Sequence, residues 1–250
     1  MSERHAYFFK GAGYLRYNID TDLVDVGPVE ISRFWTHLPE EFQSDLDAVV
    51  NWSPDLILHW ENVPLERRMV EVMERLVDIY DYPVNAAAGI VGNLQVESGV
   101  IPTRVEGAGD ERAPMRAPNF HNQLTNFTAE QIKNRNSGTQ VGPKFPGVGL
   151  AQWTTASRRA GLFTHPFGGS GLGFRILFNL DAQIDYLVHE LRSPGFAQVQ
   201  TVLTNPAVTA NAASDAVLLH FENPQLASQQ VNTRRATTQQ ALNAFRRVHP

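Results

Sequence analysis

One glutamate combines a reactive group with a helical position beside apolar residues. Glu97 follows Ile90 and Leu94 at spacings of seven and three residues, so a helix places all three on the same side. A carboxyl group that is partly removed from water loses stability in its ionised form, and its pKa rises. Such a group holds a proton near neutral pH and can donate it to a glycosidic oxygen. Glu97 is therefore a candidate general acid. An ion pair with Arg104 or Arg112 is the structural alternative.

A second segment carries groups that can bind a sugar. Residues 146–153 read Pro-Gly-Val-Gly-Leu-Ala-Gln-Trp, an apolar stretch interrupted by glycines. The indole of Trp153 offers a flat surface for a sugar ring, and the amide of Gln152 can hydrogen-bond an acetamido or hydroxyl group. A single tryptophan near glycine is also a common core residue, so this segment alone leaves both interpretations open.

Together the two segments resemble the motifs of glycan-cleaving enzymes. Glu97-Ser98 and Gly149-Leu150-Ala151-Gln152 are similar to the Glu-Ser and Gly-Leu-x-Gln signatures of goose-type lysozymes and soluble lytic transglycosylases. A longer series resembles the phage tail lysozyme family over roughly residues 62–245. Its pieces follow in order at residues 87–90, 92–99, 149–154, 158–159, 181–187, 221–224 and 234–236.

This resemblance implies a function and a set of site residues. It implies a mostly helical lysozyme-like domain that cleaves peptidoglycan between amino sugars, with Glu97 as the general acid. The residues that it implies for substrate binding are Asn93, Ser98, Gly149, Gln152 and Trp153. Asp181, Gln183, Asp185 and Glu222 also fall in the shared motifs, and we assign them mainly structural roles in helix capping and inter-helix hydrogen bonds.

Whether a second carboxylate acts as a base beside Glu97 decides between hydrolysis and formation of a 1,6-anhydro sugar. Between residues 97 and 181 the other carboxylates are Glu106, Asp110, Glu111 and Glu130. Glu130 belongs to a predicted capping box, whereas Asp110 and Glu111 lie in a glycine-rich turn and are candidates for a base that activates water. Exposed loop charges are their alternative role. Without a base, the C6 hydroxyl of muramic acid can attack instead and form a 1,6-anhydro product, as in lytic transglycosylases.

The elements that must position these residues are mainly helices. Apolar spacing and capping residues predict helices near residues 64–82, 85–97, 180–191, 212–221 and 231–245. Gly99 is expected to end the helix that carries Glu97, and the small residues at 86–89 and 92 let another helix pack closely against it. Residues 102–150 are rich in glycine and proline, which is typical of a binding or catalytic loop.

The first 52 residues differ from the rest of the chain. Residues 6–17 predict a β-hairpin around Lys10-Gly11-Ala12-Gly13, and residues 1–52 as a whole resemble one hemopexin-type repeat, a single blade of a β-propeller. One blade cannot bury both faces of its sheet, so it must pack against other protein. We therefore expect an α+β chain with a β module for binding or docking at 1–52 and a lysozyme-like domain at 53–250.

Composition excludes several other functions. The chain has 250 residues and no cysteine, so thiol nucleophiles and cysteine-ligated zinc are ruled out. Its eight histidines form no close pair, which disfavours a zinc peptidase, and we expect neither a metal nor a cofactor. No apolar run suits a membrane helix. Residues 1–82 carry a net charge of −9 and residues 83–250 a net charge of +4, without the basic and aromatic blocks typical of nucleic-acid binding.

The route to the cell wall and the activity itself have alternatives. The sequence starts without a secretory signal, so we expect synthesis in the cytoplasm and access to the wall by lysis, by holin-type release or on a phage tail or contractile injection particle. A wall-binding or particle-structural protein without turnover is the main alternative function. Cleavage of the peptide stem is a third.

Overall fold

The computed structural model describes residues 5–18, 23–34, 49–51, 60–107, 115–222, 224 and 227–249. The chain divides into two compact units, Met1–Leu58 and His59–Pro250. The division falls at 58/59 instead of the expected 52/53. Each unit is described by itself below.

The first unit holds a four-stranded antiparallel sheet in the order β3-β2-β1-β4. Its elements are β1 (His5–Lys10), β2 (Gly13–Asn18), β3 (Leu23–Glu30), the short helix α1 (Ile31–Phe34) and β4 (Val49–Asn51). Lys10 pairs with Gly13 across the turn, where Gly11 has a φ of 58°, so the predicted hairpin is confirmed. The likeness to a hemopexin blade stays a prediction, and its closing segment at 45–48 lies outside the described residues.

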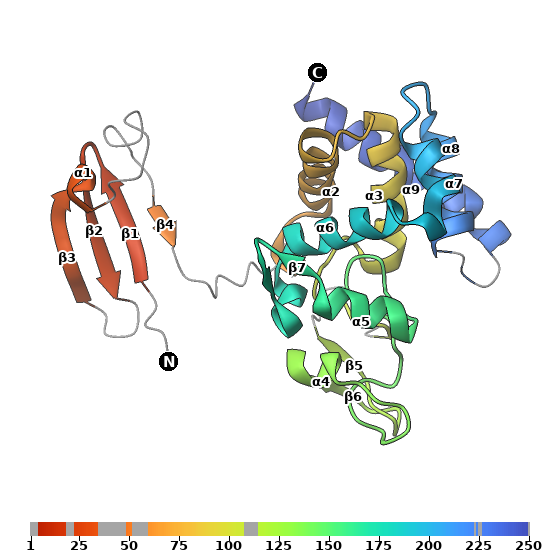
Figure 1. The fold of residues 1–250 in the computed structure, drawn as a ribbon, viewed down its shortest axis with the longest axis horizontal. Coiled ribbons are helices and arrows are strands. Elements are labelled where there is room, and N and C mark those ends of the chain that lie inside the picture. Colours follow the sequence, from red (N-terminus) through yellow and green to blue (C-terminus); the bar gives the residue numbers. More distant parts are fainter. Residues whose placement is uncertain are drawn as a thin grey trace. The chain divides into compact units, whose positions relative to one another are not determined.

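The second unit is mostly helical (Figure 1). Its longer helices are α2 (Leu65–Glu74), α3 (Val84–Ser98), α5 (Ala156–Thr164), α6 (Leu180–Leu191), α7 (Ala197–Leu203), α8 (Ala210–Val217) and α9 (Ala227–Val248). Wider helical turns extend α2 over Arg75–Ile79 and α8 over Leu218–Glu222, and tight helical turns cover Trp60–Asn62, Gly173–Phe178 and Pro194–Phe196. With the sheets, this confirms an α+β chain that is mainly helical.

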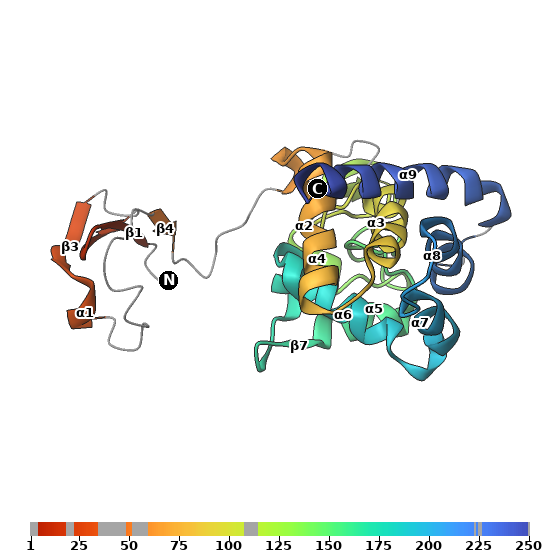
Figure 2. The ribbon, with the colours of Figure 1, turned by 90° about the horizontal axis from the view of Figure 1, so that it is seen from above.

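Helix α3 lies at the centre of this unit because it is buried from Ala86 to Leu94. Figure 2 shows α9 running across the face formed by α2, α3 and α8. A Cβ atom on Gly89 would lie 2.5 Å from the Cβ of Ala213 in α8, and one on Gly92 would lie 2.3 Å from Oγ1 of Thr238 in α9. The two glycines therefore permit the close helix packing that the sequence predicted.

The predicted helix ends are also found. Gly99 ends α3 in the left-handed conformation with a φ of 64°, which a residue without a Cβ adopts at little cost. Thr128 and Gln131 form the expected capping box at the start of α4 (Ala129–Lys133). The side chain of Asn179 caps α6 by accepting a hydrogen bond from the backbone N–H of Ala182.

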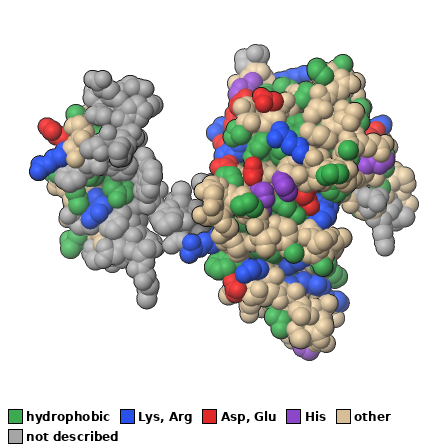
Figure 3. Space-filling model, in the orientation of Figure 1, with side chains coloured by type: hydrophobic (Ala, Val, Ile, Leu, Met, Phe, Trp, Pro, Cys, Tyr) green, Lys and Arg blue, Asp and Glu red, His purple; other side chains and the backbone are tan. Residues whose placement is uncertain are grey.

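The glycine- and proline-rich stretch forms a smaller lobe at one end of the helical unit (Figure 1). It contains α4 and the two-stranded sheet of β5 (Arg116–Pro118) and β6 (Leu124–Asn126). A second short hairpin follows α5, with β7 (Pro166–Phe167) and β8 (Ser170–Gly171). On the face of the helical unit that Figure 3 shows, side chains of both charge signs appear. None of the described helices is both long and apolar enough to cross a membrane.

Candidate active site

A pocket of ≈ 220 Å³ brings together the end of α3 and two loops of the helical unit. Its lining residues are Glu97, Arg104, Glu106, Gly107, Gln152 and Thr154. The two predicted motifs thus meet in space, because Glu97 and Gln152 line one pocket. A larger pocket of ≈ 410 Å³ is lined by Glu61–Leu65, Arg68 and Ile101. We place the site at the smaller pocket because two carboxyl groups share it.

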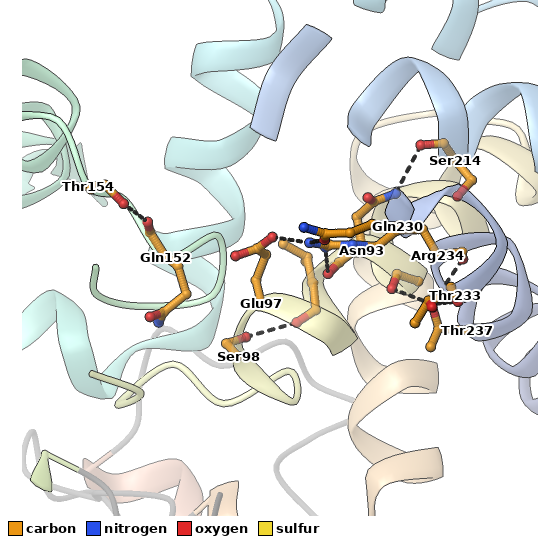
Figure 4. A network of polar contacts seen from close by, with 12 residues as sticks. Asn93, Glu97, Ser98, Gln152, Thr154, Ser214, Gln230, Thr233, Arg234 and Thr237 are labelled. Carbon is orange, nitrogen blue, oxygen red and sulfur yellow. Dashed lines mark hydrogen bonds and ion pairs between the residues drawn. The ribbon is translucent and has the colours of Figure 1, made fainter. Parts of the chain in front are cut away.

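Glu97 occupies the last turn of α3, and its carboxylate forms an ion pair with a buried arginine. Its side chain is 18% exposed, and it forms an ion pair with the Nη2 group of Arg234, which is 3% exposed. Arg234 also donates to the backbone oxygen of Asn93 over 2.8 Å and to the side chain of Gln230 over 2.9 Å. Figure 4 shows Glu97 between Gln152 on one side and Arg234 on the other. The carboxylate is therefore both oriented and reachable from the pocket.

A second carboxyl group, that of Glu222, is affected by the charge of Glu97 but does not line the pocket. Burial raises the pKa of Glu222 well above its ordinary value, and the negative charge of Glu97 raises that pKa further. The cations of Arg158 and Arg234 lower the pKa of Glu222, and the charge of Glu190 adds to the rise. Oε1 of Glu222 is buried and has no hydrogen-bond partner among the described residues. Burial and the charge of Glu97 thus both favour the protonated form of Glu222.

Glu106 lies on the other wall of the pocket and is held by backbone groups. Val105 and Val148 form an antiparallel bridge, and the N–H of Glu106 donates to the backbone oxygen of Gly147 over 2.9 Å. The N–H of Gly147 donates back to Oε2 of Glu106, also over 2.9 Å. A Cβ on Gly147 would lie 2.8 Å from that oxygen. The glycine therefore lets the carboxylate lie directly against the backbone.

Gln152 lies beside Glu106 in a strained backbone conformation. Its φ of 44° is rare for a residue with a side chain, and such strain is common at functional sites. Its side-chain N–H₂ donates to the backbone oxygen of Gly149 over 2.9 Å, and its Oε1 would lie 3.0 Å from a Cβ on Gly147. The amide oxygen thus lies on the same wall as Glu106, where it can accept a hydrogen bond from a ligand.

Trp153 is not a sugar platform, so that prediction is wrong. Its side chain is fully buried, packs against the ring of Tyr186, and donates its indole N–H to Oε2 of Glu190. Glu190 in turn binds Arg158 and accepts from the hydroxyl of Tyr186. The sequence could not reveal this because both partners of the indole lie on α6, more than 30 positions along the chain.

Three further predicted substrate-binding residues are also structural. Asn93 is fully buried and donates to the backbone oxygens of Gly89 and Ser214, and Ser98 is 1% exposed and donates to the backbone oxygen of Leu94. Gly149 is buried with a φ of 76°, and a Cβ there would lie 2.7 Å from Oε1 of Gln183. These residues contact protein and not solvent, so the prediction that they bind substrate is wrong.

The buried residues nevertheless position the pocket. The fully buried amide of Gln183 accepts from the backbone N–H of Leu150 and donates to the backbone oxygens of Pro102 and Ile176. It therefore ties α6 to the loop that carries Gln152 and to the loop that follows α3. This agrees with the structural role that we assign to Gln183 from the sequence.

Two predicted candidates remain untested, and three site residues escaped prediction. Asp110 and Glu111 lie outside the described residues. Glu106 appears in the sequence only as one of several loop acids, and nothing local marks it as lining the same pocket as Glu97. Arg234 belongs to a shared motif at 234–236, but its ion pair with Glu97 spans 137 positions of the chain. Glu222 was assigned a capping role. Among the described residues, no three histidine or acidic side chains gather to hold a metal ion.

The site and the fold together define a class of protein. A helical core with a smaller loop lobe, and an acid at the end of the central helix opening into a pocket, is the arrangement expected of a lysozyme-like domain. The chain belongs to the phage tail lysozyme family, whose family model matches residues 67–245. It is therefore a lysozyme-like protein, and the substrate that the family implies is peptidoglycan. Comparison with curated proteins and with solved structures found no match.

Proposed function

We propose that this protein cleaves the glycan strands of peptidoglycan and that Glu97 is the general acid. The observation that carries the proposal is the pocket that Glu97 shares with Glu106 and Gln152. A glycosidic bond needs a proton on its leaving oxygen, and a carboxyl group within reach of a sugar supplies it. Glu97 is partly sheltered yet open to the pocket, which suits that task.

The residues around Glu97 support a cycle of proton transfer. Glu97 donates a proton to the glycosidic oxygen, and Arg234 stabilises the carboxylate that this step leaves. The pKa of Glu222 is raised by burial and by the charge of Glu97, which favours its protonated form beside the carboxylate of Glu97. The amide oxygen of Gln152 lies where it can accept a hydrogen bond from an acetamido N–H of the sugar.

The test compares Glu97→Gln with Glu130→Gln on purified sacculi. Glu130 is a matched control because its carboxylate lies on α4, accepts from Asn134 and does not line the pocket. We expect Glu97→Gln to reduce muropeptide release by about 10²–10⁴-fold, the usual contribution of acid catalysis. Its circular dichroism should show a folded chain, with a lowered melting temperature because Arg234 loses its counter-charge. Glu130→Gln should keep full activity. Full release by Glu97→Gln would refute the proposal.

The same experiment separates the alternatives. A wild-type protein that binds sacculi but releases no soluble fragment is a wall-binding or particle-structural protein with a lysozyme-like fold. Cleavage of the peptide stem would leave glycan strands intact, which mass spectrometry of the digest detects. Fragments cut between amino sugars support glycan cleavage.

We further propose that the first unit is a hemopexin-like docking module that carries the enzyme on a phage tail or contractile injection particle to the wall. Phe8, Leu23 and Val24 are exposed on its sheet at 39%, 63% and 53%. Apolar side chains of this size favour contact with another protein. Co-purification with a particle component that depends on these side chains supports docking. A chain that stays monomeric and binds no such component contradicts it.

A further inference from the structure

Two carboxyl groups reach the same pocket from elements that approach it independently. Glu97 enters from the end of α3, and Glu106 enters from the loop bridged to residues 147 and 148. The pocket of ≈ 220 Å³ has room for several water molecules, since one water takes about 30 Å³ of liquid volume. Hydrolysis by direct attack of water needs an acid, a base and room for the water, and a pocket of this size lined by two carboxyl groups can supply them.

The other carboxyl groups of the described residues fit the role of base less well. Glu222 does not line the pocket, and burial favours its protonated form, which is a weaker base than a carboxylate. Glu130 accepts from Asn134 on its own helix and lies outside the pocket lining. Glu106 remains, with Oε2 fixed by the N–H of Gly147.

Two hydrogen bonds to Gly147 fix the position of Glu106, as a catalytic base requires. Its main chain is joined to Gly147 by one hydrogen bond and its carboxylate by a second, so the side chain cannot rotate away without losing the N–H of Gly147. Gln152 lies on the same wall, and its Oε1 is directed to the space above Gly147. A base must be held within hydrogen-bond reach of the water that it activates, and this rigid backing meets that requirement.

We propose that Glu106 is the base that activates water, and that the pocket therefore hydrolyses the glycosidic bond and does not form a 1,6-anhydro sugar. The inference rests on the proposed glycan cleavage. Glu97 gives its proton to the glycosidic oxygen, and the bond from that oxygen to C1 of the sugar breaks. The oxygen of one water forms the new bond to C1, and Glu106 takes the proton of that water. Return of this proton to Glu97 through solvent completes the cycle.

The first test is the product of the wild-type chain on purified sacculi in water labelled with ¹⁸O. We expect fragments that end in a reducing sugar and carry one labelled oxygen at C1. Fragments that end in a 1,6-anhydro sugar, lighter by one water and without label, would overturn the role of Glu106 while the proposed glycan cleavage stands. Absence of any glycan cleavage by the wild type would remove both proposals.

The second test identifies the base. We expect Glu106→Gln to lower hydrolysis by about 10²–10⁴-fold, with circular dichroism and melting temperature close to wild type. Azide needs no base to act as a nucleophile, so added azide should restore turnover of Glu106→Ala and yield glycosyl azide. Azide should not rescue Glu97→Gln, which lacks the acid. A merely structural role for Glu106 predicts no such rescue.

Glu130→Gln is the matched control, because Glu130 belongs to the same stretch of sequence, accepts from Asn134 and does not line the pocket. We expect it to keep near wild-type hydrolysis. Asp110→Asn and Glu111→Gln test the two rival candidates for the base. Should either abolish hydrolysis and be rescued by azide while Glu106→Gln stays active, the assignment of Glu106 is wrong.

Discussion

The two walls of the pocket are built in different ways. On the helix wall, Glu97 is backed by the buried guanidinium of Arg234, and Glu222 adds a second acid behind it. On the loop wall, Glu106 and Gln152 are partly exposed and are held by backbone groups of Gly147 and Gly149. Charges thus support one wall, and main-chain hydrogen bonds support the other.

In the acid–base site that we propose, this difference separates two tasks. Buried charges interact strongly because little water screens them, so the helix wall controls where a proton resides. Backbone hydrogen bonds have fixed directions, so the loop wall controls where a group points. Substitutions on the helix wall should therefore change stability and its pH dependence, whereas substitutions on the loop wall should change activity with little change in stability.

The largest effect is expected for Arg234→Met. The substitution keeps much of the side-chain volume but leaves the carboxylate of Glu97 without its buried counter-charge and Gln230 without a donor. Removing one partner of a buried ion pair costs about 3–5 kcal/mol. We expect the free energy of unfolding to fall by that amount in urea titrations.

Arg235→Met is the matched control for this prediction. Arg235 is the next residue of α9 and pairs with Asp215 at the surface, with a side chain that is 41% exposed. Water already solvates both of its charges, so we expect little change in stability. Equal destabilisation by the two substitutions would contradict the contrast between buried and exposed pairs.

Glu222→Gln is expected to have a smaller effect than Arg234→Met, and it should stabilise the folded chain at neutral pH instead of destabilising it. The raised pKa means that the folded chain keeps a proton on Glu222 that the unfolded chain loses above about pH 4.3. The wild type therefore loses stability relative to the variant as the pH rises from that value towards the folded-state pKa, at about 1.4 kcal/mol per pH unit. Near pH 4 both side chains are neutral and the difference vanishes.

Melting temperatures of Glu222→Gln and wild type at pH 4 and pH 7 measure this effect. The variant should melt higher at pH 7 and at nearly the same temperature at pH 4. Glu130→Gln, in which an exposed acid on α4 is neutralised, should show no such pH-dependent gain. A variant that is destabilised equally at both pH values would show that Glu222 acts through packing and not through its charge.

The smallest change in stability is expected for Gly147→Ala. A Cβ there would lie 2.8 Å from Oε2 of Glu106 and 3.0 Å from Oε1 of Gln152, and both atoms end flexible side chains that can move aside. We expect the free energy of unfolding to fall by about 1 kcal/mol, the usual size for a point substitution, because Gly147 is buried but the two contacting side chains can shift. Activity on sacculi should fall at least about tenfold, since a small displacement of a catalytic group is costly.

Gly149→Ala provides the contrast on the same loop. Its φ of 76° disfavours any residue with a Cβ, and that atom would lie 2.8 Å from the ring of Trp153. This substitution should lower stability as well as activity. If Gly147→Ala unfolds the chain while Gly149→Ala does not, then the Glu106 and Gln152 side chains cannot move aside, and the left-handed conformation at Gly149 does not require glycine.

Local features of the sequence were predictable because they depend on near neighbours. The end of α3 at Gly99, the caps at Thr128 and Asn179, and the close packing at Gly89 and Gly92 follow from residue types at short spacings. The same local pattern placed Glu97 at the end of a helix beside apolar residues. The resemblance to one family then assigned it to a pocket with Gln152.

The identity of the remaining site residues was not predictable from local pattern. Trp153, Asn93 and Ser98 have the side chains of a binding site, yet each is covered by an element distant in the sequence or by its own helix. Glu106 resembles any other loop acid until its loop pairs with residues 147 and 148.

The sequence by itself predicted several of the helices, the end of α3, the caps at Thr128 and Asn179, and the α+β class, because each depends on the chemistry and spacing of nearby residues. It also singled out Glu97 as the candidate acid. Only the tertiary structure decided that Arg234 and Glu222 surround that acid and that Glu106 faces its pocket. The physical reason is that burial and electrostatic coupling depend on which distant surfaces come into contact, and a chain acquires those contacts only when it folds.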